Sequence, residues 1–281
     1  MAEVEQTYGW NADRARFWLA HLAVIETPLI PVAEVIFSVV DLKPGERVLD
    51  VGCGAGATTI EAADRVGPEG WACGIDISPE MIDAARARSA APNLEWVVAD
   101  AVEYDLPIEG FDAIISRFGI MFFSDPEQAF RRLNAACRPG GRLVASVWPH
   151  RDRTPYFALP YSLLTSVLDR RRAVYTPIPD DQGPFSLGEE QQTIDLLVGA
   201  GWVDVRCSMR HDPLYLRGPA TLELAVEGLI ESNSEQGVLV GQPEEIIEEA
   251  RTALIEGLGP WHDGTGIALP GGFLMITATR H

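Results

Sequence analysis

The sequence predicts an α/β fold with a doubly wound, mostly parallel β-sheet, and three observations lead to this expectation. Between residues 45 and 148, short apolar runs of β-type alternate with segments of helical spacing. The apolar runs are nearly continuous, as in strands that are buried on both faces. Glycine and proline clusters separate the segments. A parallel sheet covered by helices on both faces satisfies all three observations.

The elements of this core are expected in alternating order along the chain. The strands are expected at 47–51, 71–75, 94–99, 111–116 and 142–148. The helices are expected at 57–66, 79–88 and 125–137. Ser78 is a natural N-cap for the helix that begins at Pro79, and Pro139-Gly140-Gly141 is expected to form a turn.

The segments on either side of this core have weaker patterns. Residues 10–40 have helical spacing, and Pro28 and Pro31 are expected to divide them into two helices. Residues 149–185 are rich in proline and arginine, and their charged runs, Arg170-Arg171-Arg172 and Asp180-Asp181, are expected to be solvated surface. Further elements are expected as helices at 188–200, 219–233 and 243–257 and as strands at 202–207 and 273–279. No linker marks a second domain, so residues 1–281 are expected to form one.

Composition and charge exclude several classes of protein. The 41 acidic residues outnumber the 22 basic ones, which gives a net charge of −19. A surface of this sign repels the phosphates of nucleic acids and anionic lipid head groups. The only lysine is Lys43, so a Schiff-base lysine or a P-loop lysine is excluded unless Lys43 itself is catalytic.

The cysteines and the N-terminal residues indicate a cytoplasmic protein. The four cysteines lie at least 20 residues apart, unlike those of zinc sites or secreted scaffolds, and are expected to be reduced thiols. The first ten residues are acidic and polar, unlike a signal peptide. Charged residues and prolines, from Glu26 to Glu34, interrupt the best candidate for a membrane span. We therefore expect no membrane association.

The segment VLDVGCGAG at 48–56 is the most informative part of the sequence. It joins a buried strand to a helix and has glycines where a Cβ would block a ligand lying against the backbone. Gly52, Gly54 and a later acid, Asp76, also fit the dinucleotide-binding pattern. Asp50 argues against that reading, because a carboxylate beside a pyrophosphate weakens its binding. Such an acid suits a ligand with an ammonium or sulfonium group.

Motifs in the core together resemble those of class I S-adenosylmethionine-dependent methyltransferases. They are VLDVGCGAG at 48–56, GIDIS at 74–78, Asp100-Ala101, SRFGIMFF at 116–123 and RPGGRLV at 138–144. The resemblance covers about residues 45–148 in order and spacing. It implies a Rossmann-like, seven-stranded sheet with a helical lid at 1–44, a cofactor-binding core at 45–148, and substrate-side insertions and last strands at 149–281.

The resemblance also implies a binding site for S-adenosylmethionine. The glycine loop would form its floor beneath the methionine and ribose, with Asp50, Gly52, Gly54 and Gly56. Asp76, at the end of the second strand, would accept hydrogen bonds from both ribose hydroxyls. An ionised carboxylate suits this role because it offers two acceptor oxygens.

Residues after the later strands would complete that site. Ile77 would lie against the adenine, Asp100 would bind the adenine amino group, and the backbone of Ala101 would lie near a ring nitrogen. Ser116 and Arg117 would line the methionine end. The resemblance is specific for the cofactor and says little about the methyl acceptor.

Methyl transfer is an in-line displacement for which the cofactor supplies most of the driving force. The protein must align the reactants and exclude water, and it needs a general base only when the acceptor must first lose a proton. The candidates for that base are Tyr8, His21 and His150. No pair of histidines has metal-ligand spacing, so no metal is expected.

Aromatic residues near the motifs have two readings. They either cage a cationic or apolar acceptor or pack in the core. These residues are Tyr8, Trp10, Trp18, Phe118, Phe122, Phe123 and Trp148.

The sequence therefore predicts a cytoplasmic S-adenosylmethionine-dependent methyltransferase that acts on an oxygen or nitrogen of a small molecule. Residues 1–40, 149–185 and 209–265 are expected to select the acceptor. One alternative is a protein that binds the cofactor without methylating, since no base is evident. Another is an NAD-dependent oxidoreductase, which leaves Asp50 and the Asp100-Ala101 pair without a role.

Overall fold

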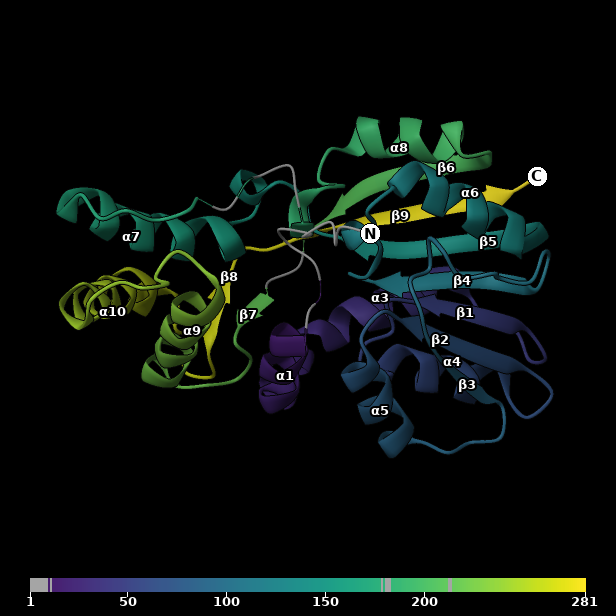
Figure 1. The fold of residues 1–281 in the computed structure, drawn as a ribbon, viewed down its shortest axis with the longest axis horizontal. Helices are drawn as coiled ribbons and strands as arrows, with labels where there is room; N and C mark the ends of the chain where they lie inside the picture. The colour runs from purple at the N-terminus through teal and green to yellow at the C-terminus, as the bar shows by residue number, and fades with distance from the viewer. Residues whose placement is uncertain (1–9, 11, 178, 180–182, 212–213) are drawn as a thin grey trace, which may run out of the picture.

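The computed structural model describes residues 10, 12–177, 179, 183–211 and 214–281. Its centre is a seven-stranded sheet with strand order β3-β2-β1-β4-β5-β9-β6 (Figure 1). β1 to β5 are parallel, and β9 is antiparallel to both of its neighbours. The expected doubly wound, mostly parallel sheet is therefore confirmed. The strands are β1 Arg47–Val51, β2 Trp71–Asp76, β3 Leu94–Val98, β4 Phe111–Arg117, β5 Cys137–Val147, β6 Trp202–Arg210 and β9 Phe273–Arg280.

Helices precede, connect and follow these strands. Those of the sheet region are α3 Ile30–Val40, α4 Ala57–Val66, α5 Pro79–Arg88, α6 Pro126–Ala136 and α8 Glu190–Gly199. The expected helices of the core begin and end within about one residue of the observed ones, because each has a clear terminal signal. Ser78 caps α5 as expected, since its Oγ accepts a hydrogen bond from the N–H of Met81.

A second body lies beside the sheet, at the left of Figure 1. It contains α7 Pro155–Arg171, α9 Leu222–Gln236, α10 Glu244–Leu258 and the short antiparallel strands β7 Leu214–Leu216 and β8 Ile267–Leu269. Its apolar core is separate from the core around the sheet and includes Leu164, Val226 and Leu254.

The segment that forms α7 was only partly predicted. The charged run Arg170-Arg171-Arg172 is exposed at the end of α7, as expected, and Asp180-Asp181 lies outside the described residues. No helix was expected between 149 and 185, however, and α7 buries Leu164, Val167 and Leu168 on one side. Of the later segments, β6 and β9 join the sheet as expected, and α7, α9 and α10 contribute to the second apolar core.

The expected turn at 139–141 lies inside a strand. β5 begins at Cys137, which pairs with Phe111, and the next pair is Arg142 with Ala113. The extra residues form an irregularity in which Gly140 has a φ of 75°. A positive φ favours glycine, so the chain does change direction here without leaving the sheet.

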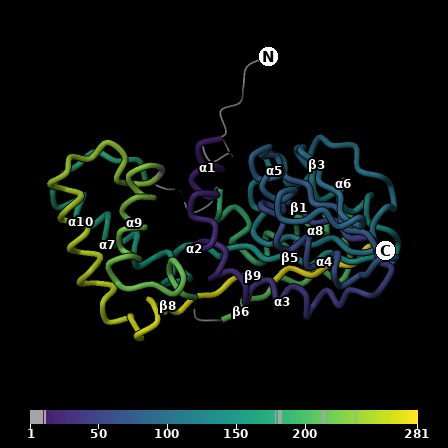
Figure 2. The backbone as a smooth tube through the Cα atoms, turned by 90° about the horizontal axis from the view of Figure 1, so that it is seen from below, coloured from purple at the N-terminus to yellow at the C-terminus, as the bar shows by residue number. Residues whose placement is uncertain are grey.

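The N-terminal helices are α1 Ala12–Ala20 and α2 Leu22–Glu26, followed by a 3₁₀ turn at Thr27–Leu29 and then α3. Pro28 lies in the 3₁₀ turn that divides α2 from α3, as expected, whereas the break between α1 and α2 at His21 was not expected. Pro28 and Pro31 each occupy a first helical turn, where their missing N–H costs nothing. In Figures 1 and 2, α1 lies between the sheet region and the second body.

The segment Leu22–Val40 has the length and hydropathy of a membrane span, with a mean hydropathy of 1.8. A core helix of a globular protein meets the same criterion, and α3 packs against β4 and β5 with Val32, Ile36 and Phe37 buried. The expectation of no membrane association stays a prediction.

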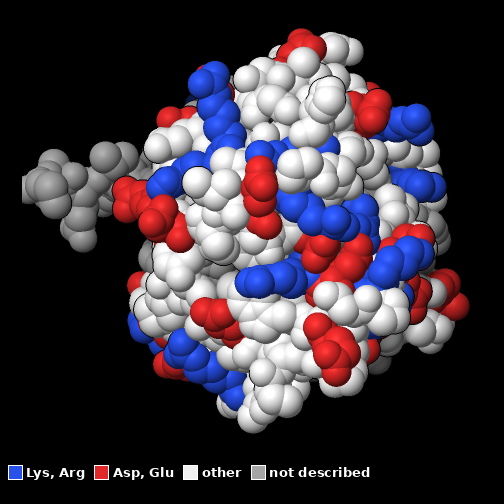
Figure 3. All heavy atoms as spheres, turned by 90° about the vertical axis from the view of Figure 1, so that its right-hand side faces the viewer, with Lys and Arg blue, Asp and Glu red and all other residues white. Residues whose placement is uncertain are grey.

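The charges on the side of the sheet remote from the second body are mixed. Figure 3 shows basic and acidic side chains interspersed on this face, so the net charge of −19 does not form one continuous acidic patch there.

Candidate functional site

A cavity of about 540 Å³ opens at the carboxyl ends of the parallel strands. This is where doubly wound sheets bind their ligands. Its lining also includes residues of α1, α2, α7 and α9, so the sheet region and the second body both contribute. The expected cofactor residues in the lining are Gly52, Gly54, Asp76, Ile77, Asp100, Ala101 and Arg117.

Glycine is favoured at the three positions after β1 for different structural reasons. Gly52 has a φ of 67°, and a Cβ there would lie 2.6 Å from the Cα of Gly119. Gly54 has a φ of 55°, but its Cβ would meet only the Met81 Cε, at 3.8 Å, so this glycine leaves room for a ligand. Gly56 has a φ of 83° and packs against Trp96, and it does not line the cavity.

Asp76 lies at the end of β2 with each carboxylate oxygen bound to one backbone N–H. Oδ2 accepts from Gly54 and Oδ1 accepts from Ser78, both at 2.9 Å. Burial raises the pKa of this carboxyl group. A carboxylate oxygen can accept a second hydrogen bond, so Asp76 can hold the loop and bind hydroxyls of a ligand.

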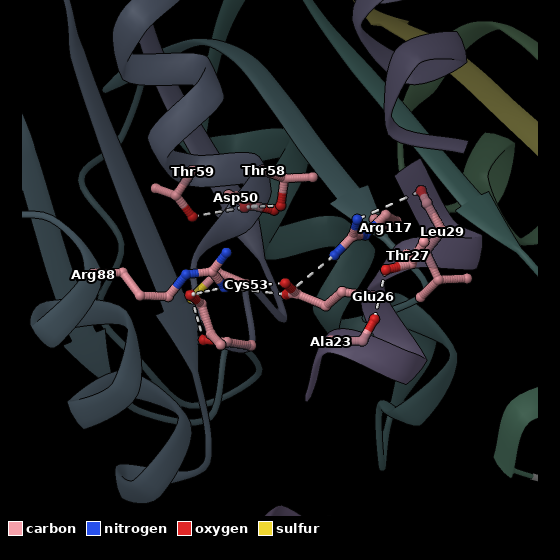
Figure 4. Close-up of polar contacts among 12 residues, drawn as sticks. Ala23, Glu26, Thr27, Leu29, Asp50, Cys53, Thr58, Thr59, Arg88 and Arg117 are labelled. Atoms are coloured by element: carbon pink, nitrogen blue, oxygen red, sulfur yellow. Dashed lines mark hydrogen bonds and ion pairs between the residues drawn. The ribbon is translucent and has the colours of Figure 1, made fainter. Parts of the chain in front are cut away.

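Asp50 is fully buried beneath the loop and does not line the cavity. Its Oδ2 accepts hydrogen bonds from the hydroxyls of Thr58 and Thr59, at 2.6 and 2.7 Å (Figure 4). Within the described part of the chain, its Oδ1 has no partner. Burial raises the pKa of Asp50 to about 6, so the charged form gains from a cation bound above it.

Two further expected residues have local roles as well. Asp100 lines the cavity, and its Oδ1 accepts a hydrogen bond from the N–H of Val102 at 2.8 Å. Ser116 is buried outside the lining, where it donates to the carbonyl of Val51 at 2.7 Å and accepts from the N–H of Gly119. Ser116 therefore fixes the two loops that meet at Gly52.

Glu26, at the end of α2, joins the N-terminal helices to the core (Figure 4). Its carboxylate lies 3.2 Å from Arg88 Nη1 of α5 and 3.7 Å from Arg117 Nη2 of β4. Arg88 also donates to the carbonyl of Ala55 in the glycine loop. Sequence reasoning treated Glu26 only as an interruption of an apolar stretch, since partners so distant along the chain leave no local signal.

The two histidines among the expected base candidates lie outside the cavity lining. Tyr8 lies outside the described residues. His21 bonds to the carbonyl of Phe17 and pairs with Glu231, 3.1 Å away, and His150 lies 3.5 Å from Glu189. Neither histidine lines the cavity.

Aromatic rings form much of the cavity wall, and some of them are also packed in the core. Phe118 and Trp148 are nearly buried and also line the cavity. Phe118 stacks on Trp148 with 3.9 Å between ring centroids, and Trp148 stacks on Tyr156 at 5.8 Å. Tyr156 of α7 was not named in advance, although residues 149–185 were expected to select the acceptor, because no helix was expected there to place its ring. Other expected aromatic residues in the lining are Trp10, Trp18, Phe122 and Phe123.

No metal centre is seen in the part of the chain that the structure describes. No group of three or more His, Cys, Asp or Glu side chains there could hold an ion. The cysteines are free, and Cys53, Cys73 and Cys137 are buried.

The fold and cavity define a Rossmann-like protein with a cavity at the carboxyl edge of its sheet. Comparison with known proteins extends this class to a family. Residues 48–141 match the family described as "Methyltransferase domain". Nocamycin O-methyltransferase of Saccharothrix syringae is 34% identical over 68% of this chain and 70% of its own length. The chain belongs to the class I S-adenosylmethionine-dependent methyltransferases.

Two further comparisons are more limited. One covers only part of the sequence, and the other concerns the fold alone. Aklanonic acid methyltransferase DauC of a Streptomyces strain is 38% identical over 36% of this chain and 47% of its own length. A phosphoethanolamine N-methyltransferase of Haemonchus contortus, solved with S-adenosylhomocysteine, has a TM-score of 0.53 and 16% identity. That match covers 94% of this chain and 58% of the other, and it supports the fold alone.

Proposed function

We propose that the chain binds S-adenosylmethionine in this cavity and methylates an oxygen atom of a small molecule. The observation that carries the proposal is the pairing of Asp76 with Gly54, which places a carboxylate beside an open glycine at the edge of the cavity. The proposal extends the family assignment to this chain's own site. The name of the Saccharothrix relative supports oxygen, and the name of the Streptomyces relative supports an acidic acceptor.

The residues of the cavity fit the cofactor's chemistry. Asp76 offers acceptor oxygens for the ribose hydroxyls, and Asp100, Ile77 and Ala101 line the part where the adenine would lie. Asp50 has a buried oxygen under the loop that has no hydrogen-bond partner among the described residues. The free-energy cost of burying this group is offset when a cationic ligand lies above it. Arg117 completes the opposite side with a guanidinium that can pair with the cofactor's carboxylate.

When bound, the cofactor supplies an electrophilic methyl group on a sulfonium. The protein's own contribution is alignment and exclusion of water. The N-terminal helices cover the cavity beside Glu26, and rings from Phe118 to Tyr156 form an apolar wall. No histidine lines the cavity among the described residues, which favours an acceptor that needs no strong base.

Charge supports a small-molecule acceptor in the cytoplasm and argues against nucleic acid. At −19, the chain as a whole repels phosphate backbones. The NAD-dependent alternative has no support from the family assignment. Only a turnover assay distinguishes a methyltransferase from a protein that binds the cofactor without methylating an acceptor.

The test combines binding and turnover. Calorimetry with S-adenosylmethionine and S-adenosylhomocysteine should give saturable binding of both, and a lack of binding at millimolar concentration would refute the proposal. Incubation with methyl-labelled cofactor and a panel of hydroxy-, carboxy- and amino-aromatic compounds should give labelled ethers or esters. Label found only on nitrogen would correct the acceptor atom. Tight binding with no labelled product would favour the non-methylating alternative.

A further inference from the structure

We propose that the acceptor is a flat aromatic anion, such as an aromatic carboxylate, and that Arg217 binds its negative charge beside Tyr156. This inference rests on the proposed function only in assigning the outer part of the cavity to the acceptor.

Arg217 is a cation with an incomplete set of partners at the cavity wall. It follows β7, lines the cavity and donates from Nη2 to the carbonyl of Gly228 in α9. Its guanidinium also lies 5.9 Å from the centre of the Phe17 ring. A guanidinium has five N–H donors, so most of them remain available for an anion.

The acidic side chain that acts on Arg217 is Glu231, and it is already paired with another residue. The charge of Glu231 raises the pKa of Arg217, but its carboxylate pairs with His21 at 3.1 Å. Within the described ranges, Arg217 forms no ion pair. Burial lowers the pKa of Arg217, which marks the cost of keeping this charge away from water. A bound anion would offset that cost.

Tyr156 provides a hydrogen-bond donor next to this cation. Its ring stacks on Trp148 and meets Phe157 edge-on, and the residue lines the cavity. Among the described residues, its hydroxyl has no hydrogen-bond partner. Burial raises the pKa of Tyr156 and the charge of Arg217 opposes that shift. The phenol therefore stays protonated and is suited to donate to an anion rather than to act as a base.

The charges of the lining are divided between the two ends of the cavity. The acidic side chains are Glu26, Asp76 and Asp100, and each already pairs with arginines or backbone N–H groups near the glycine loop. Four arginines also line the cavity, Arg14, Arg117, Arg151 and Arg217. Arg117 pairs with Glu26, and Arg151 lies 3.8 Å from the centre of the Tyr161 ring. Arg217 is the arginine whose charge acts on the hydroxyl of Tyr156. Parallel rings beside a guanidinium fit a flat anion.

The test compares two probes that differ in charge and share their shape. Binding of 2-naphthoate and of neutral 2-naphthamide is measured by calorimetry, with and without saturating S-adenosylhomocysteine. The wild-type protein should bind 2-naphthoate at least tenfold more tightly. Arg217→Gln should remove this preference, and Arg217→Lys should keep part of it. Tyr156→Phe should reduce it severalfold while the ring stacking is retained.

A matched control separates charge recognition from structural damage. Arg206→Gln, at an exposed position on β6, removes an arginine outside the cavity lining and should leave the preference unchanged. Equal binding of both probes by the wild type, binding of neither, or an equal loss of both in Arg217→Gln would overturn the inference. This calorimetry measures no methyl transfer. The proposed function can therefore fail in its own test, by a lack of cofactor binding or of labelled product, while this inference stands.

Discussion

The carboxylate of Asp76, at the end of β2, accepts a hydrogen bond from the backbone N–H of Gly54, with 2.9 Å between the two atoms. One side chain thus fixes the shape of the loop after β1 and faces the cavity. Loss of Asp76 should therefore affect ligand binding in two ways, through the ribose contact and through the loop.

Asp76→Ala should weaken the binding of S-adenosylhomocysteine by about 1.5–3 kcal/mol, because hydrogen bonds to a charged group are lost. Asp76→Asn should also weaken it, since an amide cannot accept from both Gly54 and Ser78. Titration calorimetry measures both, and Asp83→Ala on the exposed side of α5 is the control. Unchanged affinity in Asp76→Ala would mean that the ribose lies elsewhere.

Alanine at Gly52 and at Gly54 should have different effects. Both positions have positive φ, which costs a non-glycine residue about 1 kcal/mol or more. At Gly52 the new methyl group also collides with the Gly119 backbone, so Gly52→Ala should lower the free energy of unfolding by at least about 2 kcal/mol. Gly54→Ala should lower the free energy of unfolding by less than Gly52→Ala does, but it should weaken cofactor binding. Urea unfolding and calorimetry separate the two, and equal stabilities would contradict the packing argument.

Asp50→Asn should stabilise the protein in a way that depends on pH. The pKa of Asp50 rises from 3.8 to about 6 on folding, so the folded state binds a proton more readily than the unfolded state. The stability gained by protonating Asp50 is fully present below the pKa of the unfolded state, 3.8. It is lost as the pH rises through the pKa of the folded state, about 6. At pH 8 the asparagine variant should be more stable by about 1–3 kcal/mol, and the gain should shrink at pH 5.2.

Urea unfolding at the two pH values measures this gain, with Asp83→Asn as an exposed control. The same variant should bind the cationic cofactor less tightly, since the buried charge is gone. A gain of equal size at both pH values would show that the titration of Asp50 is not its source.

Glu26→Gln should loosen the N-terminal helices. The side chains of Glu26 and Arg117 are only 16% and 11% exposed, so their ion pair is less screened than one at the surface. Amide hydrogen exchange in α1 and α2 should speed up roughly tenfold, which corresponds to about 1.4 kcal/mol. Glu34→Gln, at an exposed position on α3, should not change it. Faster exchange in both variants would indicate a general loss of stability.

The sequence was sufficient for the parts of the fold that local rules determine. From 47 to 136 the helices and strands follow from apolar runs, caps such as Ser78 and glycine turns, and the motifs place Asp76 and Gly54 correctly beside the cavity. The roles of Gly56 and Ser116 in packing depend on Trp96 and Val51, which come from other strands. Contacts between segments that lie far apart along the chain produce no periodic pattern in the sequence, so they could not be predicted from it.

The helix α7 was missed for a related reason, whereas helices close to α9 and α10 were expected at 219–233 and 243–257. α7 contains Pro160 and ends in arginines, so its composition gave no helical signal. Its apolar side becomes recognisable only against α9 and α10, which follow many residues later. Tyr156 and Arg217 belong to the second body, and their proximity could not be inferred before the two insertions were placed together.

β9 comes last among the strands along the chain but lies between β5 and β6 in the sheet. While the ribosome is still making residues before 273, neither neighbour can form its final ladder, and both present open backbone edges. Completion of the sheet must therefore wait until β9 has been synthesised, and nascent chains stalled short of Phe273 would be prone to aggregate or to need a chaperone.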